Sequence, residues 1–335
     1  MLSWASLMFC WDSRPPHPRY NENWQNVWKQ RLETSSESCV KAWLSHQTYD
    51  DYWKHGSIKE NYDNIQIPIL AIGGWHDGYT NAALRMCEKL PNCKTIVGPW
   101  SHNWPDTAVP GPNIAFMDEC LQFWDEHLKG NPSKITWQDT PRVRWYQCQG
   151  EVAPGPSVLS WPGQWQSGKK PQGSSETILT LIDGGKISFE TRSQKLSNSV
   201  DVTFSGLICL ILFHTIDKTK LIFVGSAGLF CGEWLSFGAP DLPADQRSVS
   251  SYHGCWYSEP LLRPLQVFGQ CQVEINCTFN TETSQVYIAL CHVMKSKGGG
   301  HRLLTYGVQN IKGEFLNYSC ATNNLNFRWK ESYNC

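Results

Sequence analysis

The segment Ile67-Pro-Ile-Leu-Ala-Ile-Gly-Gly-Trp-His-Asp77-Gly-Tyr-Thr80 decides the fold class of this chain, together with Lys94-Thr-Ile-Val-Gly-Pro-Trp-Ser-His102. Each segment is a short apolar run with β-branched residues, and glycine ends it abruptly. This is the pattern of a strand that is buried on both faces of a parallel sheet. Between them, residues 81–90 have a helical pattern, and we expect Thr80 to cap the start of that helix. The three segments predict one βαβ unit.

Two titratable side chains follow the predicted strands. Asp77 lies after the first strand and His102 after the second, and ligand sites of open α/β sheets lie beyond the carboxyl ends of the strands. A carboxylate there can accept the Nδ1–H of an imidazole and fix its tautomer, so that Nε2 can take a proton from a nucleophile. We therefore predict Asp77 and His102 as a catalytic pair, and we interpret His76 as structural because successive loop side chains seldom converge.

Composition limits the classes of protein that fit. The 335 residues are enough for two domains, and the net charge of −1 gives no basic field for nucleic acid or an anionic membrane. The 14 cysteines form no Cys-x-x-Cys pair, and we interpret them as buried thiols. The amino terminus lacks a basic region, and the longest later apolar run, residues 207–213, is far too short to span a bilayer. We expect a cytoplasmic protein without metal or cofactor, and the sequence is compatible with a homo-oligomer.

Helical spacing recurs on both sides of the βαβ unit. In residues 1–62 apolar side chains such as Trp24, Val27 and Leu32 predict a core-facing helical face. His46 and His55 lie in this region, and we interpret both as structural. Residues 113–128 predict an amphipathic helix that ends at Gly130. Its apolar stripe consists of Ile114, Met117, Leu121, Trp124 and Leu128, and we interpret His127 near its end as structural.

The pattern changes after residue 131. Short strand-like runs alternate with turns rich in Gly, Pro, Asn and Ser, which is typical of an all-β sandwich. These runs are residues 143–146, 177–181, 267–268, 273–276, 286–290 and 303–306. The apolar run at 207–213 has no place in this pattern.

Several longer motifs resemble the Xaa-Pro dipeptidyl-peptidase and cocaine-esterase (CocE/NonD) family of serine hydrolases. They are residues 73–80, 98–102, 107–114, 232–247 and 257–269. The resemblance covers most of residues 1–312. It implies an α/β plus all-β fold: a helical cap remnant at 1–62, the C-terminal part of an α/β-hydrolase sheet at 63–131, and an incomplete jelly-roll β-sandwich at 132–335. It also implies that Asp77 and His102 match the catalytic acid and base, in the chain order usual for this fold.

The nucleophile that the resemblance implies is missing. No Gly-x-Ser-x-Gly occurs in the sequence; the nearest string, residues 224–228, begins with valine and lies in the β-rich region. We assign neither Ser226 nor Ser3 as nucleophile, because Ser3 lies on a predicted helix with no strand before it. The resemblance implies that the nucleophile elbow precedes residue 1, so that the chain is truncated. With only two strands of the hydrolase sheet, we expect residues 1–130 not to form a stable core alone.

The sequence supports two functions of different classes. The first is a serine hydrolase, a dipeptidyl-peptidase or esterase that forms an acyl-enzyme from a small ester, an amide or a peptide; this chain would carry its Asp and His but not its nucleophile. The alternative is an inactive fragment whose β-sandwich binds another molecule. A metalloenzyme is disfavoured, since neither His-Glu-x-x-His nor paired Cys-x-x-Cys motifs occur.

Overall fold

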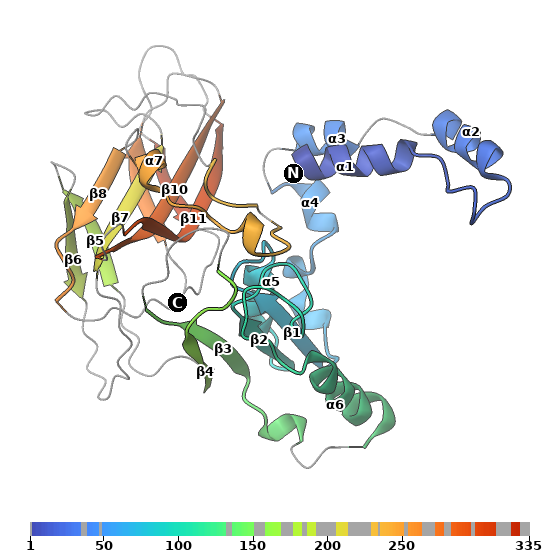
Figure 1. Ribbon diagram of the computed structural model, residues 1–335, viewed down its shortest axis with the longest axis horizontal. Helices are drawn as coiled ribbons and strands as arrows, with labels where there is room; N and C mark the ends of the chain where they lie inside the picture. The colour runs from blue at the N-terminus through green and yellow to red at the C-terminus, as the bar shows by residue number, and fades with distance from the viewer. Residues whose placement is uncertain are drawn as a thin grey trace. The chain divides into compact units, whose positions relative to one another are not determined.

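The chain divides into two compact units, Met1–Asn64 and Ile65–Cys335. The structure, a computed structural model, shows the helices and strands of both (Figure 1). It describes residues 2–34, 39–46, 49–131, 136–150, 158–168, 177–182, 186–191, 206–213, 229–233, 235–250, 254–262, 272–277, 283–295, 299–312 and 323–328. None of the helices in these ranges is long and apolar enough to cross a membrane.

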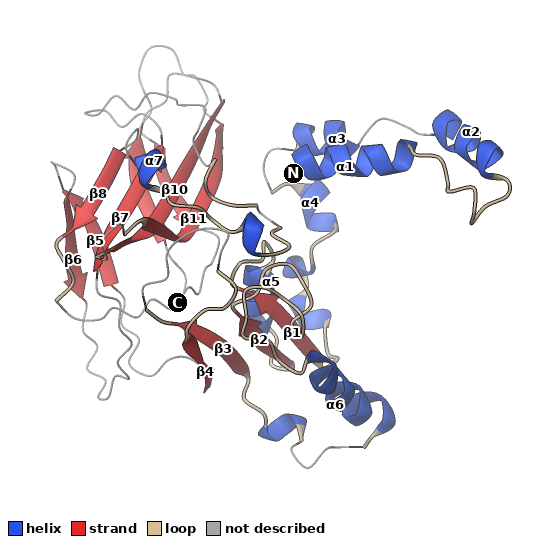
Figure 2. Ribbon diagram, in the orientation of Figure 1, coloured by secondary structure: helices blue, strands red, loops and turns tan. Residues whose placement is uncertain are grey.

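The described regular elements of the first unit are all helices or 3-10 turns, joined by loops (Figure 2). Its helices are α1 (Leu2–Ser13), α2 (Trp24–Thr34), α3 (Cys39–Ser45) and α4 (Asp51–His55), followed by the 3-10 turns η1 (Ile58–Glu60) and η2 (Tyr62–Asn64). Helix α1 packs against both α2 and α3. The expected core-facing side of α2 is wrong, because no residue of that helix is buried.

The predicted βαβ unit is confirmed in the second unit. Strands β1 (Ile69–Gly74) and β2 (Cys93–Gly98) are parallel, and α5 (Thr80–Lys89) connects them. Helix α5 buries Ala83 and Leu84. The expected capping role of Thr80 is wrong: Thr80 is the first helical residue, and its hydroxyl donates to the carbonyls of Gly74 and Asp77.

Among the described residues the sheet that contains β1 and β2 has four strands, so the expectation of two strands is wrong. Strand β3 (Val143–Cys148) pairs in parallel with β2, and β4 (Gly163–Gly168) pairs antiparallel with β3, giving the order β1-β2-β3-β4. The sequence predicts this strand as part of the sandwich, because a single short run shows a strand but not its partner. Helices cover both faces: α5 lies against Gly73, whereas α6 (Phe116–Lys129) and Leu70 line a common pocket.

Helix α6 ends as predicted, with Gly130 in the left-handed conformation at φ 68°. Its orientation differs from the prediction. The side chains expected to face the core are largely exposed, with Met117 66%, Leu121 55%, Trp124 50% and Leu128 73% exposed. The opposite side of α6 contacts the protein instead: Glu119 forms an ion pair with Arg144 at 2.6 Å, and Phe123 contacts Trp137 edge to face.

The rest of the second unit is rich in antiparallel strands. Within the described ranges, one sheet has six strands in the order β11-β10-β7-β8-β6-β5, in which only the β6–β8 pair is parallel, and β12 pairs with β9. The strands are β5 (Thr177–Ile182), β6 (Lys186–Thr191), β7 (Gly206–Phe213), β8 (Gly254–Ser258), β9 (Gln272–Cys277), β10 (Thr283–Met294), β11 (His301–Lys312) and β12 (Asn323–Arg328). Between β7 and β8 lie the 3-10 turn η4 (Ala239–Asp241) and helix α7 (Arg247–Ser250).

Strand β7 accounts for the apolar run that fitted no sequence pattern. It is an interior strand between β10 and β8, and interior strands need none of the charges that protect sheet edges. The strand expected at 267–268 lies outside the described residues.

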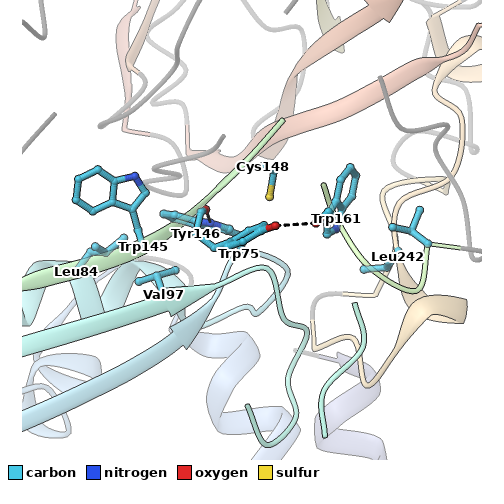
Figure 3. Packing of buried hydrophobic residues seen from close by; sticks show 9 residues of the cluster. Trp75, Leu84, Val97, Trp145, Tyr146, Cys148, Trp161 and Leu242 are labelled. Carbon is cyan, nitrogen blue, oxygen red and sulfur yellow. Dashed lines mark hydrogen bonds between the residues drawn. The ribbon is translucent and has the colours of Figure 1, made fainter. Parts of the chain in front are cut away.

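One apolar cluster joins the end of β1 to distant parts of the unit (Figure 3). Trp75 lies in it with Trp161 and with Leu242, which comes from the segment after β7. The Trp75 indole N–H donates to the Tyr146 carbonyl at 2.6 Å, and the Tyr146 hydroxyl donates to the Trp161 carbonyl at 2.9 Å. The cluster therefore fixes where β1 ends, and the loop after β1 starts from a rigid point.

Candidate active site

The loops after β1 and β2 stay side by side beyond the ends of the strands. The Trp75 N–H donates to the Gly98 carbonyl at 2.8 Å, and the His76 N–H donates to the Trp100 carbonyl at 3.0 Å. This approach requires glycine at position 74, since a Cβ atom there would lie 2.2 Å from the Trp100 carbonyl oxygen.

Asp77 is held in a tight turn between β1 and α5. Its N–H donates to the Gly74 carbonyl at 3.0 Å, and its Oδ1 accepts the Tyr79 N–H at 2.8 Å. The Thr80 hydroxyl donates to the Asp77 carbonyl at 3.1 Å. With Oδ1 and the backbone occupied in this way, Oδ2 is the carboxylate oxygen that can face the neighbouring loop.

His102 lies in the loop after β2, which is anchored on both sides. The buried Trp100 donates its indole N–H to the Pro112 carbonyl at 2.8 Å, and the Ser101 hydroxyl donates to the Val109 carbonyl at 2.8 Å. The His102 N–H donates to the Ser236 carbonyl at 2.6 Å. The backbone at His102 is therefore held in place independently of the contacts of the His102 side chain.

The two predicted side chains meet: His102 Nδ1 lies 2.9 Å from Asp77 Oδ2. The Asp77 side chain is 14% exposed and the His102 side chain 38%. Because a carboxylate only accepts hydrogen bonds, Nδ1 carries the proton whenever Asp77 is ionised. Nε2 has no hydrogen-bond partner among the described residues and belongs to a part-exposed ring, so it can accept a proton from a group that approaches it.

Aromatic rings flank the imidazole on two sides. Tyr79 and Phe237 contact it edge to face, with ring centroids 5.8 Å and 5.5 Å from that of His102. Both aromatic side chains are themselves more than half exposed. The sequence singled out the segment that contains Ser236 and Phe237 but gave it no role in the site, because nothing in a linear motif shows which loop it contacts.

A second histidine–carboxylate pair lies in the first unit and has a local cause. His46 Nδ1 is 2.6 Å from Asp50 Oδ2, four residues on, and the His46 ring stacks on Tyr52. The hydrogen bond from His46 lowers the pKa of Asp50. Because Asp50 also caps α4, the pair is accounted for by local helix geometry.

The surroundings of two more of the predicted structural histidines, and the places of the two serines rejected as nucleophiles, are as follows. His76 stacks on Trp161 with ring centroids 5.6 Å apart, and His127 contacts Phe123 and Trp137 edge to face. Ser3 lies within α1, and Ser226 falls outside the described residues. Within the described ranges, no three His, Cys, Asp or Glu side chains gather where they could hold a metal ion.

The thiol of Cys87 in the βαβ unit has a lowered pKa, as a nucleophile needs, but it is not accessible. Cys93 and Arg142 stabilise the thiolate of Cys87 by hydrogen bonding and lower its pKa to about 7, and the same contact with Cys87 raises the pKa of Cys93. Both side chains are buried, at 2% and 0% exposure. A reactive thiol must also be reachable, so the geometry does not favour Cys87 as a catalytic group.

One family model matches the part of the chain that contains Asp77 and His102. Residues 1–104 match the model of the X-Pro dipeptidyl-peptidase (S15 family). The matched range includes the whole first unit, the βαβ unit and both members of the Asp77–His102 pair. A search of curated proteins finds no match. The family match supports a hydrolase of the peptidase type.

Proposed function

We propose that this chain carries the acid and the base of a serine hydrolase of the Xaa-Pro dipeptidyl-peptidase and cocaine-esterase type. The observation that carries the proposal is the 2.9 Å contact between His102 Nδ1 and Asp77 Oδ2, with Nε2 available on a part-exposed ring. The family match over residues 1–104 supports the same class. The proposal includes a jelly-roll arrangement for the antiparallel strands of the C-terminal region.

The serine nucleophile belongs, in this proposal, to a Gly-x-Ser-x-Gly segment outside the 335 residues. As the serine oxygen attacks the substrate carbonyl, its proton passes to His102 Nε2, and Asp77 stabilises the imidazolium. His102 then gives that proton to the leaving amine or alcohol. Water then attacks the acyl-enzyme and gives its proton to His102 Nε2. The acyl group leaves as the acid, and His102 returns the proton to the serine.

The surroundings of His102 suit a substrate with an apolar group next to the bond that breaks. The side chains of Tyr79 and Phe237, each more than half exposed, border the imidazole, and neither offers a charge. An ester or amide with an apolar acyl group meets this requirement. So does the bond after an Xaa-Pro dipeptide, because proline is apolar.

The test uses the chain as it is and a small activated ester. We expect a fluorophosphonate probe to label no serine stoichiometrically, and p-nitrophenyl acetate to be cleaved slowly through attack by His102 Nε2. His102→Gln should remove the share of this cleavage that depends on His102 and leave only the background from other exposed groups such as the Cys10 thiol. Asp77→Asn should also lower it, because an amide can donate to Nδ1 and thereby place the proton on Nε2.

The matched control is His46→Gln, since His46 also bonds to a carboxylate but has a local structural role. Cleavage should be unchanged in that variant. If His102→Gln cleaves the ester as fast as the parent chain, the proposed base is wrong. Stoichiometric labelling of a serine would show instead that the nucleophile lies within this chain.

A further inference from the structure

Ser236 bonds to both of the loops that carry the acid–base pair. Its carbonyl accepts the His102 N–H at 2.6 Å, and its hydroxyl donates to the His76 carbonyl at 2.8 Å. His76 directly precedes Asp77. One residue, 134 positions after His102 in the chain, therefore holds the backbone of the base and the residue next to the acid.

The environment of Ser236 makes these bonds strong constraints. Ser236 is 1% exposed, so water does not replace its partners easily. The next residue, Phe237, places its ring edge to face with the His102 imidazole, and its N–H donates to Asp241 Oδ2 at 2.8 Å. Ser236 thus contacts the backbone of His102, and Phe237 contacts its imidazole ring.

The segment that carries Ser236 is itself closed by local contacts. The Glu233 N–H donates to the Asp241 carbonyl at 2.9 Å, which ties the two ends of the turn together. Gly232 adopts φ 77° there, and a Cβ atom on it would lie 2.6 Å from the Asp241 carbonyl oxygen. Leu242 then inserts into the apolar cluster that also holds Trp75 (Figure 3). The described residues of this segment, 232–233 and 235–242, are consequently a fixed support.

We infer that Ser236 is a positioning residue for the Asp77–His102 pair, which it links to the C-terminal β-rich region. The inference rests on the proposed function and adds a third residue to the site. Ser236 takes no part in proton transfer. It sets the separation of the two post-strand loops, and with it the geometry of the Nδ1–Oδ2 hydrogen bond.

The test follows the Nδ1 proton of His102 by proton NMR in a His46→Gln background, which removes the signal of the second histidine–carboxylate pair. A proton between an imidazole and a carboxylate gives a far-downfield resonance, and Asp77→Asn assigns it by removing it. In Ser236→Ala we expect this resonance to disappear or its exchange with water to become at least about tenfold faster, because a buried carbonyl loses its donor.

Two further variants separate positioning from general stability. Thr95→Val removes another buried hydroxyl, which donates to the Ala71 carbonyl at 2.9 Å, and it should leave the resonance unchanged. Ser236→Cys keeps a weak donor of similar size and should retain it. Should Ser236→Ala not fold, the Cys variant decides: a retained resonance that exchanges measurably faster than in the parent chain supports positioning by the hydroxyl, and parent-like exchange overturns it.

The remaining outcomes are distinct. A parent-like resonance in Ser236→Ala overturns the positioning role while the proposed function stands. Loss of the resonance in Thr95→Val as well overturns it too, because the effect would then follow stability. Absence of the resonance from the parent chain removes the acid–base pair, and with it the proposed function.

Discussion

Replacing Gly74 by alanine should separate the two loops that carry the acid–base pair. A Cβ atom at position 74 would lie 2.2 Å from the Trp100 carbonyl oxygen and 2.7 Å from the carbonyl carbon, whereas Cβ atoms essentially never come within 3.0 Å of such atoms. The loops must therefore move apart by at least about 0.8 Å. Both neighbours are backbone atoms, so no side-chain rotation relieves the contact.

The expected effects follow from that displacement. Overpacking of this kind costs about 1–3 kcal/mol of the free energy of unfolding. The hydrogen bond from the His76 N–H to the Trp100 carbonyl, now 3.0 Å, is the first to lengthen. If the whole displacement reaches the side chains, the Nδ1–Oδ2 separation grows from 2.9 Å to about 3.7 Å, beyond the range in which a hydrogen bond forms.

The assay is urea unfolding combined with the proton NMR signal of His102 Nδ1. Gly73→Ala is the matched control on the same strand, because a Cβ atom there meets only ordinary contacts of 3.5 Å to Thr80 and 3.6 Å to Ala83. We expect the control to change stability by less than about 1 kcal/mol and to keep the signal. Equal stability and an intact signal in Gly74→Ala would refute the close approach on which the site is built.

Three further outcomes are expected. Gly130→Ala should lower the free energy of unfolding by about 1 kcal/mol, measured in urea, because only the backbone at φ 68° resists the new side chain and no atom lies within 4 Å. Burial lowers the pKa of His301, so the unfolded chain takes up a proton first as pH falls below about 6.5; stability should fall there, and His301→Gln should flatten that slope in unfolding midpoints at pH 7.5 and 5.5. In amide exchange, Ala71 should be protected and Leu70 and Ile72 should not, since the Ile69 N–H points toward β2 and alternate amides point to the outer edge of β1; equal protection would contradict that edge.

The acid–base pair could be predicted because each of its members follows a strand with a strong local signal. The runs before Gly74 and Gly98 are apolar, short and ended by glycine, and the parallel register that they imply brings Asp77 and His102 to one edge. The prediction needed only residues within 36 positions of one another. Sequence reasoning is most reliable over such distances, because period and turn chemistry decide the result there.

The predictions that failed were those that needed to know what lies against an element. The apolar stripe of α6 was recognised, but a periodic pattern does not show which partner covers it, and here an ion pair holds the other side of the helix. Strand β3 was recognised as a strand and assigned to the wrong sheet for the same reason. The prediction that Thr80 caps α5 was wrong by one residue: Tyr79 is the cap and Thr80 is the first helical residue.

Ser236 shows why the complete site was beyond the sequence. The contacts that hold His102 cross 134 residues, and no periodicity or spacing links the two positions. The Asp77–His102 hydrogen bond is formed within the βαβ unit, yet its geometry depends on Ser236 and, through Leu242, on the apolar cluster around Trp75. Because a separation of less than 1 Å decides whether that hydrogen bond exists, the chemistry of the pair is a property of the second unit as a whole and not of the strand ends alone.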